Sequence, residues 1–335
     1  MSAKNVLVQY GTGGLGDLLI ITPFFKDFAQ QYPDKKLYFH FKYPFIRDRY
    51  IQVFDNNPYF HLYTNDFNPD ILVDFNWSDK DNELEQKRFS DKTVKYIDNF
   101  YHEFSRRSGL NVARTMSYVD MYLSDSEKAE VQAMISNKKK PVCLVNDGYH
   151  PIYTTTRNWG WPNFQRVINL LHDKIDFVQF GDRKAGFFHG KLLNCVDALD
   201  KTNIRDLFKM VMASDFMLSN DSSPYHIASV NALYCKRTVV TVLGGKSCYE
   251  WLNCYSPENV SYELLYNNDK FTNCYESGKY CCDIGNVYAT SAGFTSVCDT
   301  RLCKCPTVNC VGQLMASCFA CISPEEVAAR IEKHL

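Results

Sequence analysis

A glycine-rich segment near the start, Gly11–Gly16, is the first place where this sequence could do chemistry. It follows a short apolar run and matches the G-x-G-x-x-G pattern of dinucleotide-binding loops. That interpretation also requires an acidic residue about 20 residues further on to hold a ribose, and the matching segment, Phe39–Lys42, contains none. Without a dinucleotide, glycines at this position still let a backbone approach a ligand and place a helix N-terminus behind it.

Asp17 follows this loop directly, in the first turn of the expected helix. The helix dipole stabilises a carboxylate at that position, so a purely structural role is open. The alternative is a general base, because open α/β folds bind their ligands where the strands end and the helices begin.

A second polar segment, Asn220–His226, follows a strand pattern and opens a helix pattern. The free N–H groups of a helix start, together with the hydroxyls of Ser222 and Ser223, suit a pyrophosphate. Asp221 by itself is a poor neighbour for a phosphate, and it could instead cap the helix or bind a hydroxyl of a ribose or sugar. His226 lies within the first turn or two, where a structural role and a ligand contact are both open.

Arg157 lies in a loop between a strand pattern and a helix pattern, at the same expected edge of the sheet. Its guanidinium could offer a fork of donors to a phosphate, or it could be a surface residue packed on Trp159 or Trp161. Gly181 and Asp182 end the next strand pattern, where a base or ribose could dock or where the chain could simply turn.

The cysteines gather in one part of the chain. Eleven of the 14 fall between Cys248 and Cys321, in a loop-rich stretch without helix or strand periodicity. Clustered cysteines without a secretory signal favour a metal site or reduced thiols over disulfides. Four thiolates around zinc or iron would hold together a loop that lacks a core, although Cys318-x-x-Cys321 is the only C-x2-C pair.

The elements that must position these residues alternate along the chain, with a polar break at 138–141. Apolar runs predict strands at 6–10, 37–41, 71–75, 142–146, 177–180, 216–219 and 238–243. Helical spacing predicts helices at 17–32, 96–108, 162–172, 203–213 and 223–230, and a last one at the C-terminus. Thr202 is expected to cap the helix at 203–213, and Ser323, Pro324 and Glu326 to form the capped start of the last helix. The alternation predicts two doubly wound α/β units.

The composition excludes several classes of protein. The 335 residues carry 37 Lys plus Arg and 38 Asp plus Glu, so the net charge of −1 provides no global basic field for nucleic acid. With 45% hydrophobic and 22% charged residues, the chain is not mostly disordered. The start is not a signal peptide, and Leu18–Ile21 is far short of the ~20 apolar residues that span a bilayer, so we expect a cytoplasmic protein.

Four segments together resemble the heptosyltransferase-type enzymes of glycosyltransferase family 9. In chain order they are Gly14–Pro23, Arg157–Phe164, Ser219–Ala228 and Cys318–Val327. The third segment, with its Asn-Asp pair followed by a histidine, is the most specific of the four. The resemblance implies the α/β GT-B fold, in which two Rossmann-like doubly wound domains face each other across a cleft.

The implied domains follow the break in the strand pattern. We expect an acceptor-binding domain at 1–140 and a nucleotide-sugar-binding domain at 141–322, which includes a cysteine-rich segment at 274–321. A C-terminal helix at 323–335 completes the chain.

The resemblance also assigns roles to residues. Asp17 matches the catalytic base, and Arg157 stands where the family has a basic residue against the donor phosphates. The other implied donor contacts are Gly14, Gly16, Gly181, Asp182, Asp221, Ser222, Ser223 and His226. Ser223 replaces a glycine of the family pattern, which narrows access to the backbone.

The implied reaction is an inverting transfer, with ADP-heptose as the favoured donor. Asp17 takes the proton from an acceptor hydroxyl while that oxygen attacks the anomeric carbon, and the nucleoside diphosphate leaves. The acceptor could be a glycan, a lipopolysaccharide core or a protein, and the chain could form an oligomer. No metal is required for this transfer. The rival interpretations are a non-catalytic protein that binds a nucleotide sugar or a metal, and a glycosyltransferase acting on modified phage DNA.

Some members of this family carry a cysteine-held metal finger. That resemblance favours Cys282, Cys305 and Cys318 as ligands of a structural zinc or iron, with Cys281 or Cys274 as the fourth. Reduced, unliganded thiols are the alternative.

Overall fold

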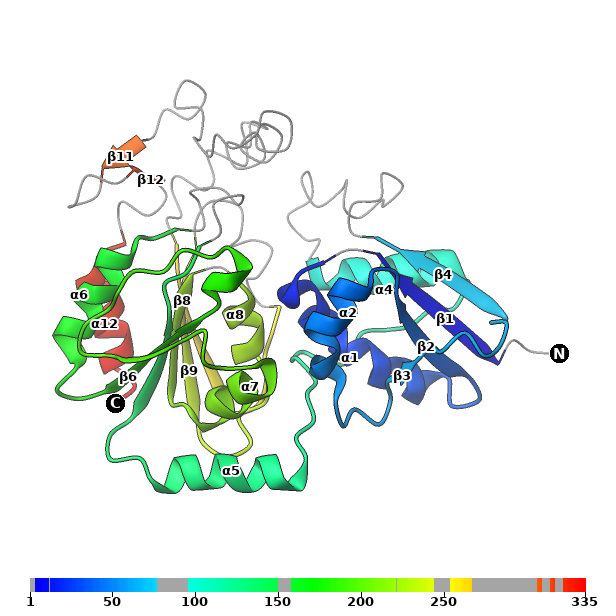
Figure 1. The fold of residues 1–335 in the computed structure, drawn as a ribbon, viewed down its shortest axis with the longest axis horizontal. Coiled ribbons are helices and arrows are strands. Elements are labelled where there is room, and N and C mark those ends of the chain that lie inside the picture. Colours follow the sequence, from blue (N-terminus) through cyan, green and yellow to red (C-terminus); the bar gives the residue numbers. More distant parts are fainter. Residues whose placement is uncertain are drawn as a thin grey trace. The chain divides into compact units, whose positions relative to one another are not determined.

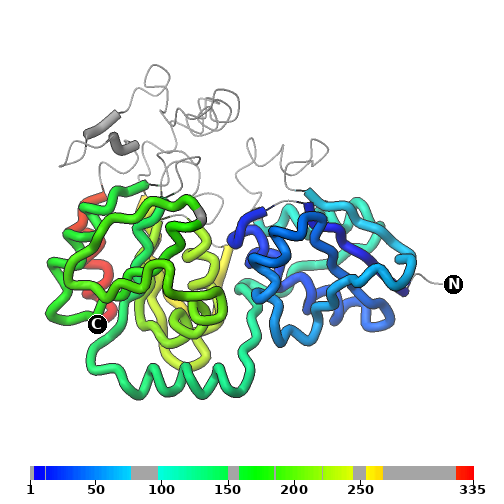
Figure 2. Tube along the Cα trace, in the orientation of Figure 1, coloured from blue at the N-terminus to red at the C-terminus, as the bar shows by residue number. Residues whose placement is uncertain are grey.

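The computed structural model describes residues 4–11, 13–76, 96–149, 158–220, 222–243, 254–266, 306–308, 314–316 and 322–335. The chain divides into two units, each described by itself below. The first is built from Met1–Lys128, Ser229–Asn231 and Tyr249–Pro257, and the second from the remaining residues. Figure 2 traces the chain through both units.

A parallel sheet with the strand order β3-β2-β1-β4 forms the centre of the first unit (Figure 1). Its elements are β1 (Asn5–Tyr10), α1 (Leu15–Gln31), β2 (Lys36–Phe41), α2 (Pro44–Tyr50), the 3-10 helix η1 (Ile51–Phe54), β3 (His61–Leu62), β4 (Ile71–Phe75) and α4 (Tyr96–Ser108). The chain runs from β1 to β2 and β3 on one side and then to β4 on the other. The point where the strand order reverses therefore lies between β1 and β4, where open α/β sheets bind ligands.

Aromatic rings hold α1 against its neighbours in this unit. The ring centroid of Phe24 lies 4.8 Å from that of Phe100 and 4.7 Å from that of Phe104, both on α4. Phe25 contacts Phe39 of β2, with centroids 5.5 Å apart. Because edge-on aromatic pairs add to the energy of burial, these contacts fix the helix and its N-terminal turn relative to the sheet.

The second unit contains a parallel sheet with the order β10-β9-β8-β5-β6-β7 (Figure 1). Helix α5 (Asp125–Ser136) connects the first unit to the second. The other elements of the second unit are β5 (Val142–Asn146), α6 (Trp161–Leu171), β6 (Asp176–Gly181), the 3-10 helix η3 (Arg183–Ala185), β7 (Val196–Leu199), α7 (Ile204–Ala213), β8 (Phe216–Asn220), α8 (Ser223–Ala228), β9 (Arg237–Val242), β10 (Val260–Leu265) and α12 (Pro324–Glu332). The described residues also include a short antiparallel pair, β11 (Pro306–Val308) and β12 (Leu314–Ala316).

Helices cover the central part of this sheet. Apolar residues of α6 and α12 form one buried cluster with alternate residues of β5, β8 and β9, while α7 and α8 pack on the other side (Figure 1). Counted from β5, the strands follow the 3-2-1-4-5-6 order of a Rossmann fold, and the order reverses between β5 and β8. No helix among the described residues is both long enough and apolar enough to cross a bilayer.

The structure confirms the predicted strands at 71–75 and 142–146 and the predicted helix at 96–108. The prediction that Thr202 caps α7 is wrong, because Asn203 is the N-cap and its side chain accepts from Asp206 N at 2.8 Å. Asn203 and Asp206 form the reciprocal capping box, whereas the residue three positions after Thr202 is an arginine.

Two further predictions about the second unit need correction. Helix α8 ends at Ala228 and not at residue 230. The stretch between Cys248 and Cys321 was expected to be loop-rich, yet Val260–Leu265 forms β10 and extends the sheet beside β9. Ser323 is confirmed as the N-cap of the last helix, since its Oγ accepts from Glu326 N at 3.1 Å, and Pro324 lies in the first turn as predicted.

Candidate functional site

The N-terminal turn of α1 holds Asp17 in a defined orientation. Gly14 is the N-cap residue, and its backbone N–H donates to Asp17 Oδ2 at 2.7 Å. This contact is the carboxylate half of a capping box, and the side chain is half-buried. The contact is compatible with both predicted roles of Asp17, a helix-capping group and a positioned base.

The glycines of this loop differ in whether the surrounding residues leave room for a side chain. At Gly13, with φ of 156°, a Cβ atom would lie 2.0 Å from Tyr10 Oη, so the chain's own tyrosine excludes any side chain. At Gly14 a Cβ would lie 3.7 Å from Asp17 Oδ2, an ordinary contact. Gly16 lies half-buried within α1. Packing therefore explains Gly13, whereas no contact among the described residues requires a glycine at position 14.

In the second unit, four of the predicted donor residues that the structure describes lie at the carboxyl edge of one sheet. Gly181 is the last residue of β6 and Asp182 follows it, while Ser222 and Ser223 follow β8. The order of the sheet reverses between β5 and β8, so this edge is where a doubly wound fold binds its ligand.

Asn220, the last residue of β8, hydrogen-bonds to two neighbouring segments at this edge of the sheet. Its Nδ2 donates to Asp147 O at 3.2 Å, and its Oδ1 accepts from Trp159 N at 3.2 Å. Trp159 is fully buried, and its indole Nε1 donates to Ile322 O at 3.1 Å, just before α12. Both ends of the loop that carries Arg157 are thus hydrogen-bonded to the end of β8.

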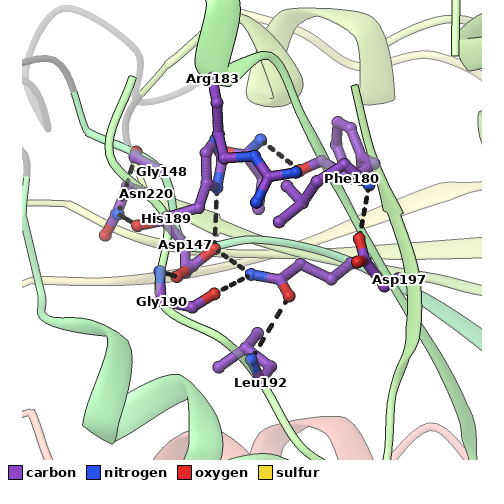
Figure 3. Close-up of polar contacts among 12 residues, drawn as sticks. Asp147, Gly148, Phe180, Arg183, His189, Gly190, Leu192, Asp197 and Asn220 are labelled. Carbon is purple, nitrogen blue, oxygen red and sulfur yellow. Dashed lines mark hydrogen bonds and ion pairs between the residues drawn. The ribbon is translucent and has the colours of Figure 1, made fainter. Parts of the chain in front are cut away.

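A hydrogen-bonded Asp–His pair that the sequence did not predict lies beside this edge (Figure 3). Asp147 Oδ1 accepts from His189 Nδ1 at 2.9 Å and from Gln179 Nε2 at 2.8 Å. Asp147 Oδ2 accepts from Gly190 N at 2.7 Å. The only sequence signal was an acid directly after a buried strand, because its partners lie 32 to 43 positions away.

The imidazole of His189 fills the space between two glycines. A Cβ atom at Gly148 would lie 2.2 Å from His189 Cε1, and one at Gly181 would lie 2.3 Å from the same atom. Gly181 was predicted as a donor contact, and the structure shows that this histidine occupies the space next to its α-carbon. Only the backbone of Gly181 is left to meet a ligand.

The remaining described candidates differ in burial. The Oγ of Ser222 is buried and has no hydrogen-bond partner among the described residues, while Ser223 is half-buried at the first position of α8. His226 is 4% exposed, with its ring centroid 5.5 Å from that of Tyr225. Asp182 is exposed.

Several predicted residues lie outside the described residues. They are Arg157, Asp221, Cys274, Cys281, Cys282, Cys305 and Cys318. Among the residues that the structure does describe, Cys143, Cys195 and Cys235 are free thiols, and no group of three or more metal-ligating side chains occurs.

Comparisons with known proteins identify the fold. No protein-family model and no curated protein sequence matches this chain. The structure resembles the family 9 glycosyltransferase of Veillonella parvula, with a TM-score of 0.62 and 13% identity over 99% of this chain and 97% of that one. ADP-heptose LPS heptosyltransferase II of E. coli gives a TM-score of 0.55 and 11% identity, over 99% of this chain and 98% of that one.

A third solved structure is that of the iron-containing dodecameric glycosyltransferase TibC of enterotoxigenic E. coli. It gives a TM-score of 0.60 and 17% identity, over 100% of this chain and 77% of that one. At these identities the likeness establishes the arrangement of the chain. The protein therefore has the GT-B fold of the family 9 glycosyltransferases.

Proposed function

We propose that this protein is an inverting glycosyltransferase that moves a sugar from a nucleotide-sugar donor, ADP-heptose before others, to an acceptor hydroxyl. The observation that supports the proposal is the sheet edge where the strand order reverses between β5 and β8, close in sequence to Ser222 and Ser223, in a fold that resembles those of solved heptosyltransferases. The choice of donor is supported by the similarity in fold to the ADP-heptose LPS heptosyltransferase II of E. coli.

We assign the donor to the second unit. The Oγ of Ser222 supports this assignment, because it is buried and has no partner among the described residues. Such a hydroxyl costs about 1–3 kcal/mol, and an oxygen of the diphosphate would satisfy it. Arg157 is proposed to pair with the same phosphates, and Asp182 and Asp221 to bind hydroxyls of the ribose or sugar. The burial of His226 favours a packing role behind this edge over direct contact with the donor.

We assign the acceptor and the base to the first unit. The acceptor hydroxyl forms a bond from its oxygen to the anomeric carbon, the bond from that carbon to the diphosphate oxygen breaks, and Asp17 takes the hydroxyl proton. The hydrogen bond from Gly14 N–H supports this role, since it fixes one carboxylate oxygen and thereby orients the other. The nucleoside diphosphate leaves with its charge offset by Arg157. The proposed acceptors are a glycan, a lipopolysaccharide core or a protein.

A panel of nucleotides and nucleotide sugars tests the proposal. Thermal unfolding is measured with ADP, UDP and GDP, and then with ADP-heptose and ADP-glucose. We expect ADP and ADP-heptose to raise Tm, because a ligand at 100 times its Kd stabilises the folded state by about 2.7 kcal/mol. Release of ADP from ADP-heptose should follow when an acceptor glycan is added. Equal Tm values with all five compounds would contradict the assignment.

We also propose that the cysteine-rich segment holds a structural zinc or iron. Support comes from the gathering of eleven cysteines within 248–321 and from the iron named for TibC. Metal analysis of the purified protein should find about one equivalent of metal, which Cys282→Ser should reduce. Cys195→Ser is the matched control, because burial raises the pKa of the Cys195 thiol to about 12 and keeps it protonated. Equal metal content in both variants and the wild type would contradict the ligand assignment.

A further inference from the structure

The Asp147–His189 pair connects three parts of the second unit at the carboxyl edge of the sheet (Figure 3). Asp147 follows β5, Gln179 lies on β6, and His189 and Gly190 belong to the connection from η3 to β7. Gln179 strengthens the junction, because its Nε2 also donates to Gly190 O at 2.8 Å. The carboxylate of Asp147 thus binds an imidazole, an amide side chain and a backbone N–H at once.

We propose that Asp147 and His189 are positioning residues for the nucleotide donor, which they serve by fixing the backbone at Gly148 and Gly181. This inference rests on the proposed function and adds to it the group that shapes its donor site. The pair itself touches no ligand, since the side chains of Asp147 and His189 are 0% and 1% exposed.

The ring of His189 fixes the backbone of the two glycines by direct contact. Its Cε1–Nε2 edge lies against the α-carbons of both glycines, at distances that would exclude any Cβ atom. Gly148 is also linked to the neighbouring strand, because its carbonyl oxygen accepts from Nδ2 of Asn220, at the end of β8, at 3.5 Å. A displaced ring would therefore move the backbone at the point where the strand order reverses.

The hydrogen bonds of Asp147 make the arrangement selective for a carboxylate. His189, Gln179 and Gly190 all donate to the carboxylate, so Asp147→Asn would turn an amide N–H₂ toward at least one N–H group. A buried carboxylate with this many donors is satisfied, and removal of one donor leaves part of its charge without compensation. We therefore expect the pair to act as one unit and not as two independent side chains.

A size-complementation experiment tests the proposal. Gly148→Ala places a methyl group 2.2 Å from the ring, at a position where φ is not in the left-handed region, so the ring is the source of the conflict. His189→Asn keeps an N–H donor near the Nδ1 position and removes the Cε1–Nε2 edge. We measure the Kd of ADP by calorimetry at a temperature well below Tm, and the KM and kcat for ADP-heptose, with Leu193→Ala at an exposed site of the same connection as the control.

We expect Gly148→Ala to weaken ADP binding by at least tenfold and to raise KM more than it lowers kcat. The double variant Gly148→Ala/His189→Asn should bind ADP more tightly than Gly148→Ala alone, and Leu193→Ala should bind as the wild type does. If both single variants lower Tm while the Kd of ADP stays within twofold, the pair is structural only and the proposal is overturned. Absence of ADP binding by the wild type would overturn the proposed function together with this inference.

Discussion

Replacement of Trp159 by phenylalanine should destabilise the second unit strongly. Trp159 is fully buried against Phe164, with ring centroids 5.2 Å apart, and its Nε1 donates to Ile322 O at 3.1 Å. The indole thus joins the start of α6 to the residue that precedes the N-cap of α12. Phenylalanine keeps an aromatic ring but has no N–H group.

The expected cost has two parts. The carbonyl of Ile322 would lose its donor, which costs about 1–3 kcal/mol for a buried acceptor. The smaller ring would leave part of the indole volume empty, and since Phe or Trp to Ala changes cost about 3–5 kcal/mol, this partial loss costs about 1 kcal/mol. The sum is about 2–4 kcal/mol, or a Tm lower by roughly 5–15 °C for a unit of this size.

Urea unfolding, monitored by circular dichroism, measures this loss of stability. Trp161→Phe is the matched control, because Trp161 is 38% exposed and its replacement should change the free energy of unfolding by less than about 1 kcal/mol. The urea midpoint should fall for Trp159→Phe at an unchanged slope. A Trp159→Phe variant as stable as the control would refute the assigned hydrogen bond and packing.

Two further predictions concern the first unit. Burial raises the pKa of Glu103, but two neighbouring arginines of α4 more than offset this and hold the pKa below its ordinary 4.5. The stabilisation by the Glu103 carboxylate is therefore complete above about pH 4.5 and is lost as pH falls through the folded-state pKa. Glu103→Gln should lower the free energy of unfolding by about 1.5–3 kcal/mol at pH 7 and progressively less below pH 4. A loss that does not depend on pH would contradict the ion pairs. Gly13→Ala should lower the free energy of unfolding by about 1–3 kcal/mol, because the new Cβ would clash with Tyr10 Oη. Gly14→Ala should cost less than about 1 kcal/mol, since its Cβ would make an ordinary contact. Equal urea midpoints for the two variants would contradict the clash at Gly13.

The sequence allowed the central strands to be predicted because a buried parallel strand is apolar on both faces. Val239 and Val240 of β9 are both fully buried, so the strand is a continuous apolar run. Strand β10 was missed because, among the described strands, it pairs with β9 alone and keeps mostly half-buried side chains, including Glu263. An edge strand of this kind lacks the continuous apolar signal.

Helix α5 was missed for a different reason. Val131 is its only buried residue, so the apolar spacing that marks an amphipathic helix is absent. A capping signal was available: Ser124 N donates to Glu127 Oε2 at 2.7 Å, and Glu127 N donates to Ser124 Oγ at 3.3 Å. The Ser-x-x-Glu pattern at 124–127 would have predicted its start.

The candidate site could be predicted where its residues follow strands. Asp17 and Ser222 lie at helix starts that the strand patterns placed at sheet edges. The pairing of Asp147 with His189 could not be predicted, because the two residues are 42 positions apart and meet only when β5, β6 and the connection to β7 are packed. The roles of Gly148 and Gly181 beside the imidazole depend on the same long-range packing.

The most direct measurement is the turnover of ADP-heptose by Asp17→Asn. Asparagine keeps the size of the side chain and an oxygen that can accept from Gly14 N–H, but it cannot take a proton from the acceptor. We predict a Tm within about 2 °C of the wild type, a Kd for ADP within twofold, and turnover at least ~100-fold lower. Turnover within threefold of the wild type would show that Asp17 only caps the helix and would contradict its assignment as the base.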